Sequence, residues 1–229
     1  MKFLIIIPAR KGSKGVPGKN KIKILDKPLI QYTIEQALNL DDNIDIIISS
    51  DDSEIFEITD KFNLKKRIRP DFLSQDKSKM LPVLNDALIY YNKFFNKPDY
   101  VILLQPTCPL RRKQDIINAI NKVKLTNCDT LISVIKVEDS HPGRMYRKTT
   151  KGLVPNIPNL VEINRQDLPP LYLRNGAIYI VKSELILNNV LYGNYIESYE
   201  MNRNNSINID DAFDLKLAEI LIKNEIIKS

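Results

Sequence analysis

Short apolar runs alternate with helical patterns over the first 135 residues of this 229-residue chain. The strand candidates are near-continuous runs of Ile, Val and Leu at residues 3–7, 44–49, 100–104 and 130–134. Such runs are typical of parallel strands buried on both faces. Between them, apolar residues recur at helical spacing in residues 29–40, 53–62, 80–95 and 114–124. Strands and helices in alternation predict an α/β fold with a doubly wound, mostly parallel sheet.

The alternation stops between residues 138 and 170, where seven residues are Pro or Gly and the apolar runs are short. Within a single domain of residues 1–229, we expect this segment to be an excursion from the sheet, a small β arm that packs on a partner subunit. Regular structure returns with a strand at 177–181, a short helix near Glu184 and a strand at 207–209. A final helix over 211–227 closes the domain, with Asp210 or Asp211 as its N-cap.

Composition narrows the class of protein. Apolar residues make up 43% of the chain and charged residues 27%, which is ordinary for a soluble globular protein. The apolar runs are too short for a membrane helix, and the start of the chain lacks the pattern of a signal peptide. The two cysteines, Cys108 and Cys128, do not have metal-ligand spacing. We therefore expect a cytoplasmic protein with no membrane partner.

The net charge of +6 is concentrated in one place. Residues 1–27 hold eight Lys or Arg against one acid, Asp26, so that this segment carries +7 and residues 28–229 sum to −1. A nucleic-acid-binding protein usually spreads its cations along a face and places aromatic residues between them. Because the first 27 residues contain Phe3 but no Tyr or Trp, the pattern favours a local anion site over a nucleic-acid surface, which stays the third alternative.

The first strand candidate leads directly into a loop with three glycines and no acid, whose cations are Arg10, Lys11, Lys14 and Lys19. Glycines allow the backbone to approach a ligand closely, and clustered cations favour a polyphosphate. The spacing fits neither a Walker A loop nor a dinucleotide-binding fingerprint. A solvated basic turn is the alternative interpretation.

Six motifs follow one another along nearly the whole chain: residues 8–20, Arg69-Pro70, 105–111, 165–169, 175–179 and 206–210. In this order they closely resemble the acylneuraminate cytidylyltransferases. The resemblance implies a Rossmann-like nucleotidyltransferase that couples CTP to a 2-keto sugar acid such as sialic, legionaminic or pseudaminic acid, giving a CMP-sugar and pyrophosphate. It also implies a Mg²⁺ cofactor and a homodimer.

The resemblance assigns CTP-binding roles to residues of the basic loop and beyond. It implies that Arg10, Ser13, Lys14 and Lys19 cradle the triphosphate, that Asn20 bonds the ribose or a phosphate oxygen, and that Arg69 contacts the nucleotide. From the residues alone, the pattern favours Arg69 as a solvated member of the basic run at 65–67.

On the sugar side, the resemblance points to Gln105, Arg165, Asn175 and Tyr179. Arg165 is the candidate for the sugar carboxylate, because a guanidinium can hold it through two parallel hydrogen bonds. Gln105 could instead fix the turn that follows it, and Tyr179 could be a core residue. The family has a basic residue at the position of Arg144 that is thought to reach the neighbouring subunit's site. His141, the single histidine, we interpret as structural.

Magnesium requires hard oxygen ligands. The last family motif carries two alternate carboxylates, whereas this chain has Asn208 and Asp210. An amide oxygen can bind a metal but brings no charge, so we expect weaker metal affinity at Asp210 and Asn208. Arg10, Lys19 and Asp210 are the implied catalytic residues, although Asp210 could serve only as a helix cap. A CMP-Kdo-type synthetase and a catalytically weak CTP-binding relative remain as alternatives.

Overall fold

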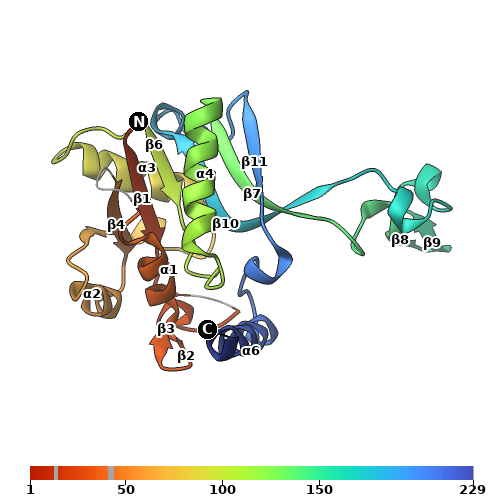
Figure 1. Ribbon diagram of the computed structural model, residues 1–229, viewed down its shortest axis with the longest axis horizontal. Coiled ribbons are helices and arrows are strands. Elements are labelled where there is room, and N and C mark those ends of the chain that lie inside the picture. Colours follow the sequence, from red (N-terminus) through yellow and green to blue (C-terminus); the bar gives the residue numbers. More distant parts are fainter. Residues whose placement is uncertain (13–14, 41–43, 229) are drawn as a thin grey trace.

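The computed structural model describes residues 1–12, 15–40 and 44–228. Its main feature is a seven-stranded sheet in the order β11-β7-β10-β6-β1-β4-β5 (Figure 1). The strands are β1 (Phe3–Pro8), β4 (Ile44–Ser50), β5 (Lys65–Ile68), β6 (Tyr100–Leu103), β7 (Thr130–Lys136), β10 (Tyr172–Lys182) and β11 (Ile196–Glu200). Only β10 runs antiparallel to its neighbours. The predicted doubly wound, mostly parallel sheet is confirmed.

Helices cover both faces of this sheet. On one face lie α1 (Leu29–Ala37), α2 (Ser53–Asp60) and α4 (Lys113–Thr126), and on the other α3 (Met80–Asn92) and α5 (Ser183–Leu187). Successive side chains of β1 point alternately into the two cores, Phe3 and Ile5 toward the first and Leu4 and Ile6 toward the second. All six residues of β1 are buried, which explains its continuous apolar sequence.

A third, smaller core lies beneath the sheet's carboxyl edge. It joins α6 (Ala212–Lys228) to α1 and to the short strand β2 (Lys23–Ile24), which pairs with β3 (Lys27–Pro28). The helix begins after Asp211, whose Oδ1 accepts from the backbone N–H groups of Phe213 and Asp214 at 2.8 and 3.0 Å. Of the two predicted caps, Asp211 is therefore the one in use.

The strand predicted at residues 207–209 is wrong. This segment forms no ladder. Its Ile209 N–H donates to the carbonyl of Thr107 at 2.8 Å, the Ile209 carbonyl accepts from Lys19 Nζ, and the Ile209 side chain fills the third core. Two edge strands, β5 and β11, were not predicted. Strand β5 reads Lys-Lys-Arg-Ile, and its cations pair with acids on neighbouring elements, which suits an edge but gives no apolar signal.

Between β7 and β10 the chain leaves the sheet and forms a projecting arm (Figure 1). The tip is an antiparallel hairpin of β8 (Tyr146–Thr149) and β9 (Gly152–Pro155). At the base, buried His141 accepts from Gly143 N–H through Nδ1, and its Nε2 lies 3.0 Å from the carbonyl of Pro169. The interpretation of His141 as structural agrees with these contacts. The arm exposes apolar side chains, with Leu153 68% exposed.

The described residues also form six short 3-10 helices, which span Lys19–Lys21, Asp71–Leu73, Pro142–Arg144, Pro158–Leu160, Arg165–Asp167 and Arg203–Asn205. None of the described helices is both long and apolar enough to cross a membrane.

The strand order positions a crevice. From β1 the chain passes to β4 and β5 on one side and later returns to β6 on the other side of β1. In parallel α/β sheets, ligands bind outside the carboxyl ends of the strands where the order reverses in this way. The loops that follow β1 and β6 meet at that point.

Candidate active site

The loop after β1 is tied down at its start. Ala9 exchanges hydrogen bonds with the end of β4, donating to the carbonyl of Ser49 at 2.9 Å and accepting from the Ser50 hydroxyl at 2.5 Å. The Asn20 amide donates to the Arg10 carbonyl at 3.0 Å and closes the loop on itself. In the free chain Asn20 therefore shapes the loop, and its predicted contact with ribose or phosphate stays a prediction.

A cavity of about 200 Å³ lies at the switch point between β1 and β6. Its lining includes five of the predicted site residues, namely Arg10, Lys19, Asn20, Arg69 and Gln105. Three of these are cations, and the lining, taken over the described residues, includes no acid. Ser13 and Lys14, the other predicted triphosphate ligands, lie outside the described residues. The arrangement suits a polyanion.

Arg10 and Lys19 each contact an acidic side chain from another segment. Arg10 Nη1 lies 2.7 Å from Asp76 Oδ1, a partner that sequence reasoning missed because nothing in the pattern of residues 74–79 marks it. Lys19 is buried, and its Nζ donates to the carbonyl of Ile209 at 2.6 Å and lies 3.6 Å from Asp210 Oδ1. Lys19 thus joins the basic loop to the segment before α6.

Arg69 is not a solvated member of the basic run. It is 4% exposed, and its guanidinium donates to the carbonyl and the hydroxyl of Ser49 at the end of β4. Burial lowers the pKa of Arg69 to about 10, so the side chain remains charged near neutral pH. A buried cation at the cavity wall is a strong anion-binding group because the local dielectric is low.

Gln105 lies two residues beyond the end of β6, and its carbonyl accepts from Cys108 N–H at 3.3 Å, which closes the following turn. Its backbone therefore fixes the turn, while the residue lines the cavity. Arg111 anchors the same turn from below: fully buried, it donates to the carbonyl of Ala177 at 2.7 Å and to the Thr33 hydroxyl at 2.9 Å. Burial lowers the pKa of Arg111 to about 10. This structural role was not predicted, although the residue belongs to a matched motif.

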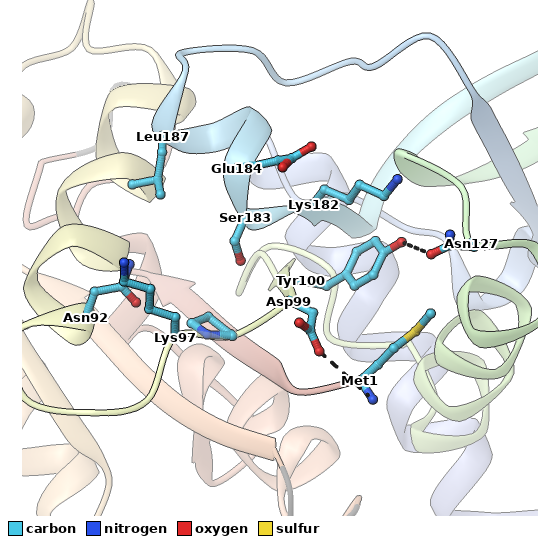
Figure 2. A pocket seen from close by; sticks show the side chains of 11 residues that line it. Met1, Asn92, Lys97, Asp99, Tyr100, Asn127, Lys182, Ser183, Glu184 and Leu187 are labelled. Carbon is cyan, nitrogen blue, oxygen red and sulfur yellow. Dashed lines mark hydrogen bonds and ion pairs between the residues drawn. The ribbon is translucent and has the colours of Figure 1, made fainter.

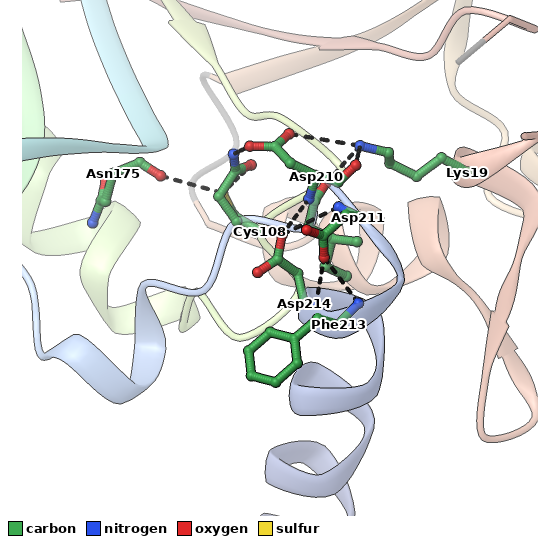
Figure 3. Close-up of polar contacts among 9 residues, drawn as sticks. Lys19, Cys108, Asn175, Asp210, Asp211, Phe213 and Asp214 are labelled. Carbon is green, nitrogen blue, oxygen red and sulfur yellow. Dashed lines mark hydrogen bonds and ion pairs between the residues drawn. The ribbon is translucent and has the colours of Figure 1, made fainter. Parts of the chain in front are cut away.

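The segment before α6 crosses the basic loop at close range (Figure 3). A side chain at Gly15 would collide with the carbonyl oxygen of Asp210, so only glycine fits there. Asn208 Nδ2 donates to Asp210 Oδ2 at 2.7 Å, and Asp214 accepts from the Asp210 backbone N–H at 2.9 Å. The two predicted metal ligands are therefore adjacent, and the Asp210 carboxylate is largely exposed.

This donor set fits magnesium in part. Mg²⁺ is usually held by one or two carboxylates together with substrate phosphates and water. Asp210 supplies one carboxylate, but Asn208 turns its amide nitrogen toward it, and the amide oxygen lies 3.7 Å from the Cys108 thiol. No group of three His, Cys, Asp or Glu side chains suited to a metal occurs among the described residues. A magnesium ion here would depend on phosphate oxygens for much of its coordination.

The predicted sugar-side residues on β10 are buried. Asn175 lies where the register of β10 against β7 shifts, and its Oδ1 accepts from Ser133 at 2.6 Å while its Nδ2 donates to Ser206 at 2.9 Å. These contacts occupy both ends of the amide, so the predicted sugar contact is not supported by this geometry. Tyr179 is 7% exposed within the second core, and burial raises its pKa.

Arg165 lies in the arm, away from the cavity of the same chain. It is exposed, and its Nη1 lies 3.1 Å from Asp139 Oδ1, the oxygen that Arg144 approaches at 3.3 Å. It lines a separate cavity of about 380 Å³ at the arm's base, next to His141. Within one chain the structure does not bring Arg165 together with the other predicted ligands.

A larger cavity of about 560 Å³ lies at the opposite, amino edge of the sheet (Figure 2). Its lining balances Lys97 and Lys182 against Asp99 and Glu184. Lys182 also pairs with Asp129 at 2.9 Å. With the Met1 amino group beside Asp99, three cations share this lining with two acids, whereas the crevice at the carboxyl edge has three cations and, over the described residues, no acid.

A doubly wound sheet with a basic crevice at its switch point is an architecture in which α/β proteins bind phosphorylated ligands. The solved structure of CMP:2-keto-3-deoxy-manno-octonic acid synthetase in complex with CTP matches 98% of this chain and 100% of that chain, with a TM-score of 0.73 and 20% sequence identity. At this identity the likeness shows the fold alone.

The chain belongs to the cytidylyltransferase family, whose model matches residues 4–225. It is 32% identical to the pseudaminic acid cytidylyltransferase of Campylobacter jejuni, over 97% of each chain. It is 31% identical to the CMP-N,N'-diacetyllegionaminic acid synthase of Legionella pneumophila, again over 97% of each. The resemblance inferred from the motifs is confirmed.

Other relatives are longer. The N-acylneuraminate cytidylyltransferase of Escherichia coli is 31% identical over 95% of this chain but only 51% of its own length. The corresponding protein of Streptococcus agalactiae is 34% identical over 52% of its length. The chain thus spans about half the length of these curated relatives.

Proposed function

We propose that this protein is a cytidylyltransferase that couples CTP to a nonulosonic acid such as sialic, legionaminic or pseudaminic acid. One observation carries the proposal: three cations, Arg10, Lys19 and Arg69, converge with Gln105 on the switch-point cavity of a chain that belongs to this family. Near-full-length similarity to proteins named for pseudaminic and legionaminic acid supports the substrate class.

In the proposed reaction, the anomeric hydroxyl of the sugar acid attacks the α-phosphorus of CTP, and pyrophosphate leaves. Two anions must be held side by side, so positioning and charge neutralisation contribute most of the catalysis. Arg10 and Lys19 bind the triphosphate with Ser13 and Lys14, while Arg69 and Asn20 contact the nucleotide. Gln105 meets the sugar at the end of β6. Arg10 and Lys19 would each exchange an acidic partner, Asp76 or Asp210, for phosphate oxygens.

Asp210 and Asn208 would hold a magnesium ion. Such an ion supplies charge neutralisation at the phosphate oxygens. In this chain the Asn208 amide keeps the Asp210 carboxylate in place through the hydrogen bond between them. Because Asn208 brings no charge, the site should need more magnesium than a site with two carboxylates.

We further propose a homodimer in which the arm completes the partner's site. Arg165, the candidate for the sugar carboxylate, lies in the arm and shares Asp139 with Arg144. The exposed apolar residues of the arm offer a packing surface. We also propose that the protein acts in the cytoplasm, since Cys108 and Cys128 are both buried and form no disulfide.

The test is pyrophosphate release from CTP and magnesium with sialic, legionaminic, pseudaminic and Kdo acids in parallel. We expect release with a nonulosonic acid, none when CTP is replaced by ATP, GTP or UTP, and loss of release in EDTA. Release with Kdo alone would reassign the substrate. CTP binding without release from any acid would favour a catalytically weak relative, and absence of CTP binding would overturn the proposal.

A further inference from the structure

The side chain of Thr107 is unusual among the residues of the candidate active site. Its Oγ1 is buried and forms no hydrogen bond of normal length among the described residues, although it interacts with the weakly polar thiol of Cys108. Buried polar groups are nearly always hydrogen-bonded, so an orphaned hydroxyl needs an explanation. Of the described buried side-chain atoms that lack a partner, only Thr107 Oγ1 belongs to a residue lining the switch-point cavity.

The backbone around Thr107 is firmly held. Its carbonyl accepts from Ile209 N–H at 2.8 Å, and the turn from Gln105 to Cys108 is closed by a hydrogen bond of 3.3 Å. Thr107 therefore sits where the turn after β6 meets the segment that carries Asp210. The backbone is held by hydrogen bonds of normal length, whereas the hydroxyl interacts only weakly, with the thiol of Cys108.

We propose that Thr107 Oγ1 hydrogen-bonds an oxygen of the sugar acid, in a subsite shared with Gln105; this rests on the function proposed above. The predicted nucleotide ligands Arg10, Lys19 and Arg69 come from the loops after β1 and β5, whereas Thr107 and Gln105 share the turn after β6. Rotation about χ1 exchanges the hydroxyl and methyl positions and turns the covered hydroxyl toward a ligand in the cavity.

Two substitutions separate ligand binding from packing. Thr107→Val keeps the shape and removes the hydroxyl, while Thr107→Ser keeps the hydroxyl and removes the methyl group. Both are measured with CTP and the acid that the wild-type protein uses. For Thr107→Val we expect KM for the acid to rise about 10-fold or more, while KM for CTP stays within about 2-fold. The thermal midpoint should stay or rise, because an unpaired buried polar group is removed. Thr107→Ser should stay within about 3-fold of wild type in KM for the acid.

The opposite results would overturn the inference. Wild-type kinetics in Thr107→Val, or a rise in KM for CTP alone, would remove Thr107 from the sugar subsite. Equal loss of activity and of thermal midpoint in both variants would show a packing role. If these results came from an active wild-type protein, the proposed function would stand without this contact. A wild-type protein inactive with every acid would overturn both.

Discussion

The two edges of the sheet carry cavities of opposite character. The cavity at the amino edge is larger, about 560 Å³, and its lining balances two Lys against Asp and Glu. The cavity at the carboxyl edge, about 200 Å³, is lined by three cations from the loops after β1 and β5. Size alone would select the wrong edge for a polyanion. Convergence of like charges is costly in a folded protein, so it marks the edge where an anionic ligand compensates.

The strongest test of this contrast compares two lysines that each face an aspartate. Lys19 lies 3.6 Å from Asp210 at the carboxyl edge, and Lys182 lies 2.9 Å from Asp129 at the amino edge. We expect Lys19→Met to lower kcat/KM for CTP about 100- to 1,000-fold, because a preorganised donor to the phosphates is lost. Lys182→Met should change it by no more than about 2-fold. Equal effects in the steady-state kinetics would abolish the distinction between the edges.

Arg165 tests whether the carboxyl edge is completed by a second chain. Lys19→Met and Arg165→Ala should each be nearly inactive alone, since each lacks a ligand for one substrate anion. If the arm acts in the partner's site, mixed dimers contain one intact site, and an equal mixture that exchanges subunits should regain about a quarter of wild-type activity. The activity of mixed and separate samples is compared after refolding them together or apart. No recovery would place Arg165 in the site of its own chain or outside any site.

Arg111 sharpens the comparison by showing that not every cation at the carboxyl edge is a ligand. It is fully buried, and its donors support the Ala177 carbonyl, Thr33 and Gln36. Arg111→Met should lower the free energy of unfolding by about 3 kcal/mol, since the buried acceptors lose their donor. The exposed Lys113 provides the control, and Lys113→Met should cost less than about 1 kcal/mol in urea unfolding. Similar losses in both variants would contradict the structural role.

The smallest expected effect concerns the metal. Asn208→Asp adds a second carboxylate beside Asp210, so the magnesium concentration for half-maximal activity should fall several-fold. Asn204→Asp adds the same charge at an exposed position nearby and should leave the magnesium dependence unchanged. A magnesium titration of activity separates the two. Identical titrations for both variants and wild type would remove Asn208 from the metal site.

Sequence alone predicts the centre of this fold well. Strand β1 is buried on both faces, so its apolar run is continuous and unambiguous. The edge strands cannot be predicted in this way. Strand β5 carries three cations whose acidic partners lie on other elements, such as Asp86 for Arg67. Residues 207–209 have a strand-like pattern, but Ile209 packs under α6 and the segment finds no neighbouring strand.

The candidate site likewise has features that the sequence predicts and features that it does not. The cations of the first loop are predictable because residue type and clustering announce an anion site. The burial of Arg69 is not, since the neighbouring Lys65 and Lys66 give it the appearance of a solvated charge. Arg165 is predictable as a guanidinium suited to a carboxylate, but its distance from the cavity depends on where the arm projects, which no local pattern encodes.

Gly15 shows how a map of mutational tolerance could mislead. The Asp210 carbonyl passes so close to its Cα that any side chain would force two backbone segments apart. A saturation screen for activity would therefore score position 15 as intolerant to every replacement, as strictly as Lys19. Its intolerance would reflect the close contact of two backbone segments rather than a role in the reaction. A ranking of positions by such scores would not separate structural residues from those that bind substrate.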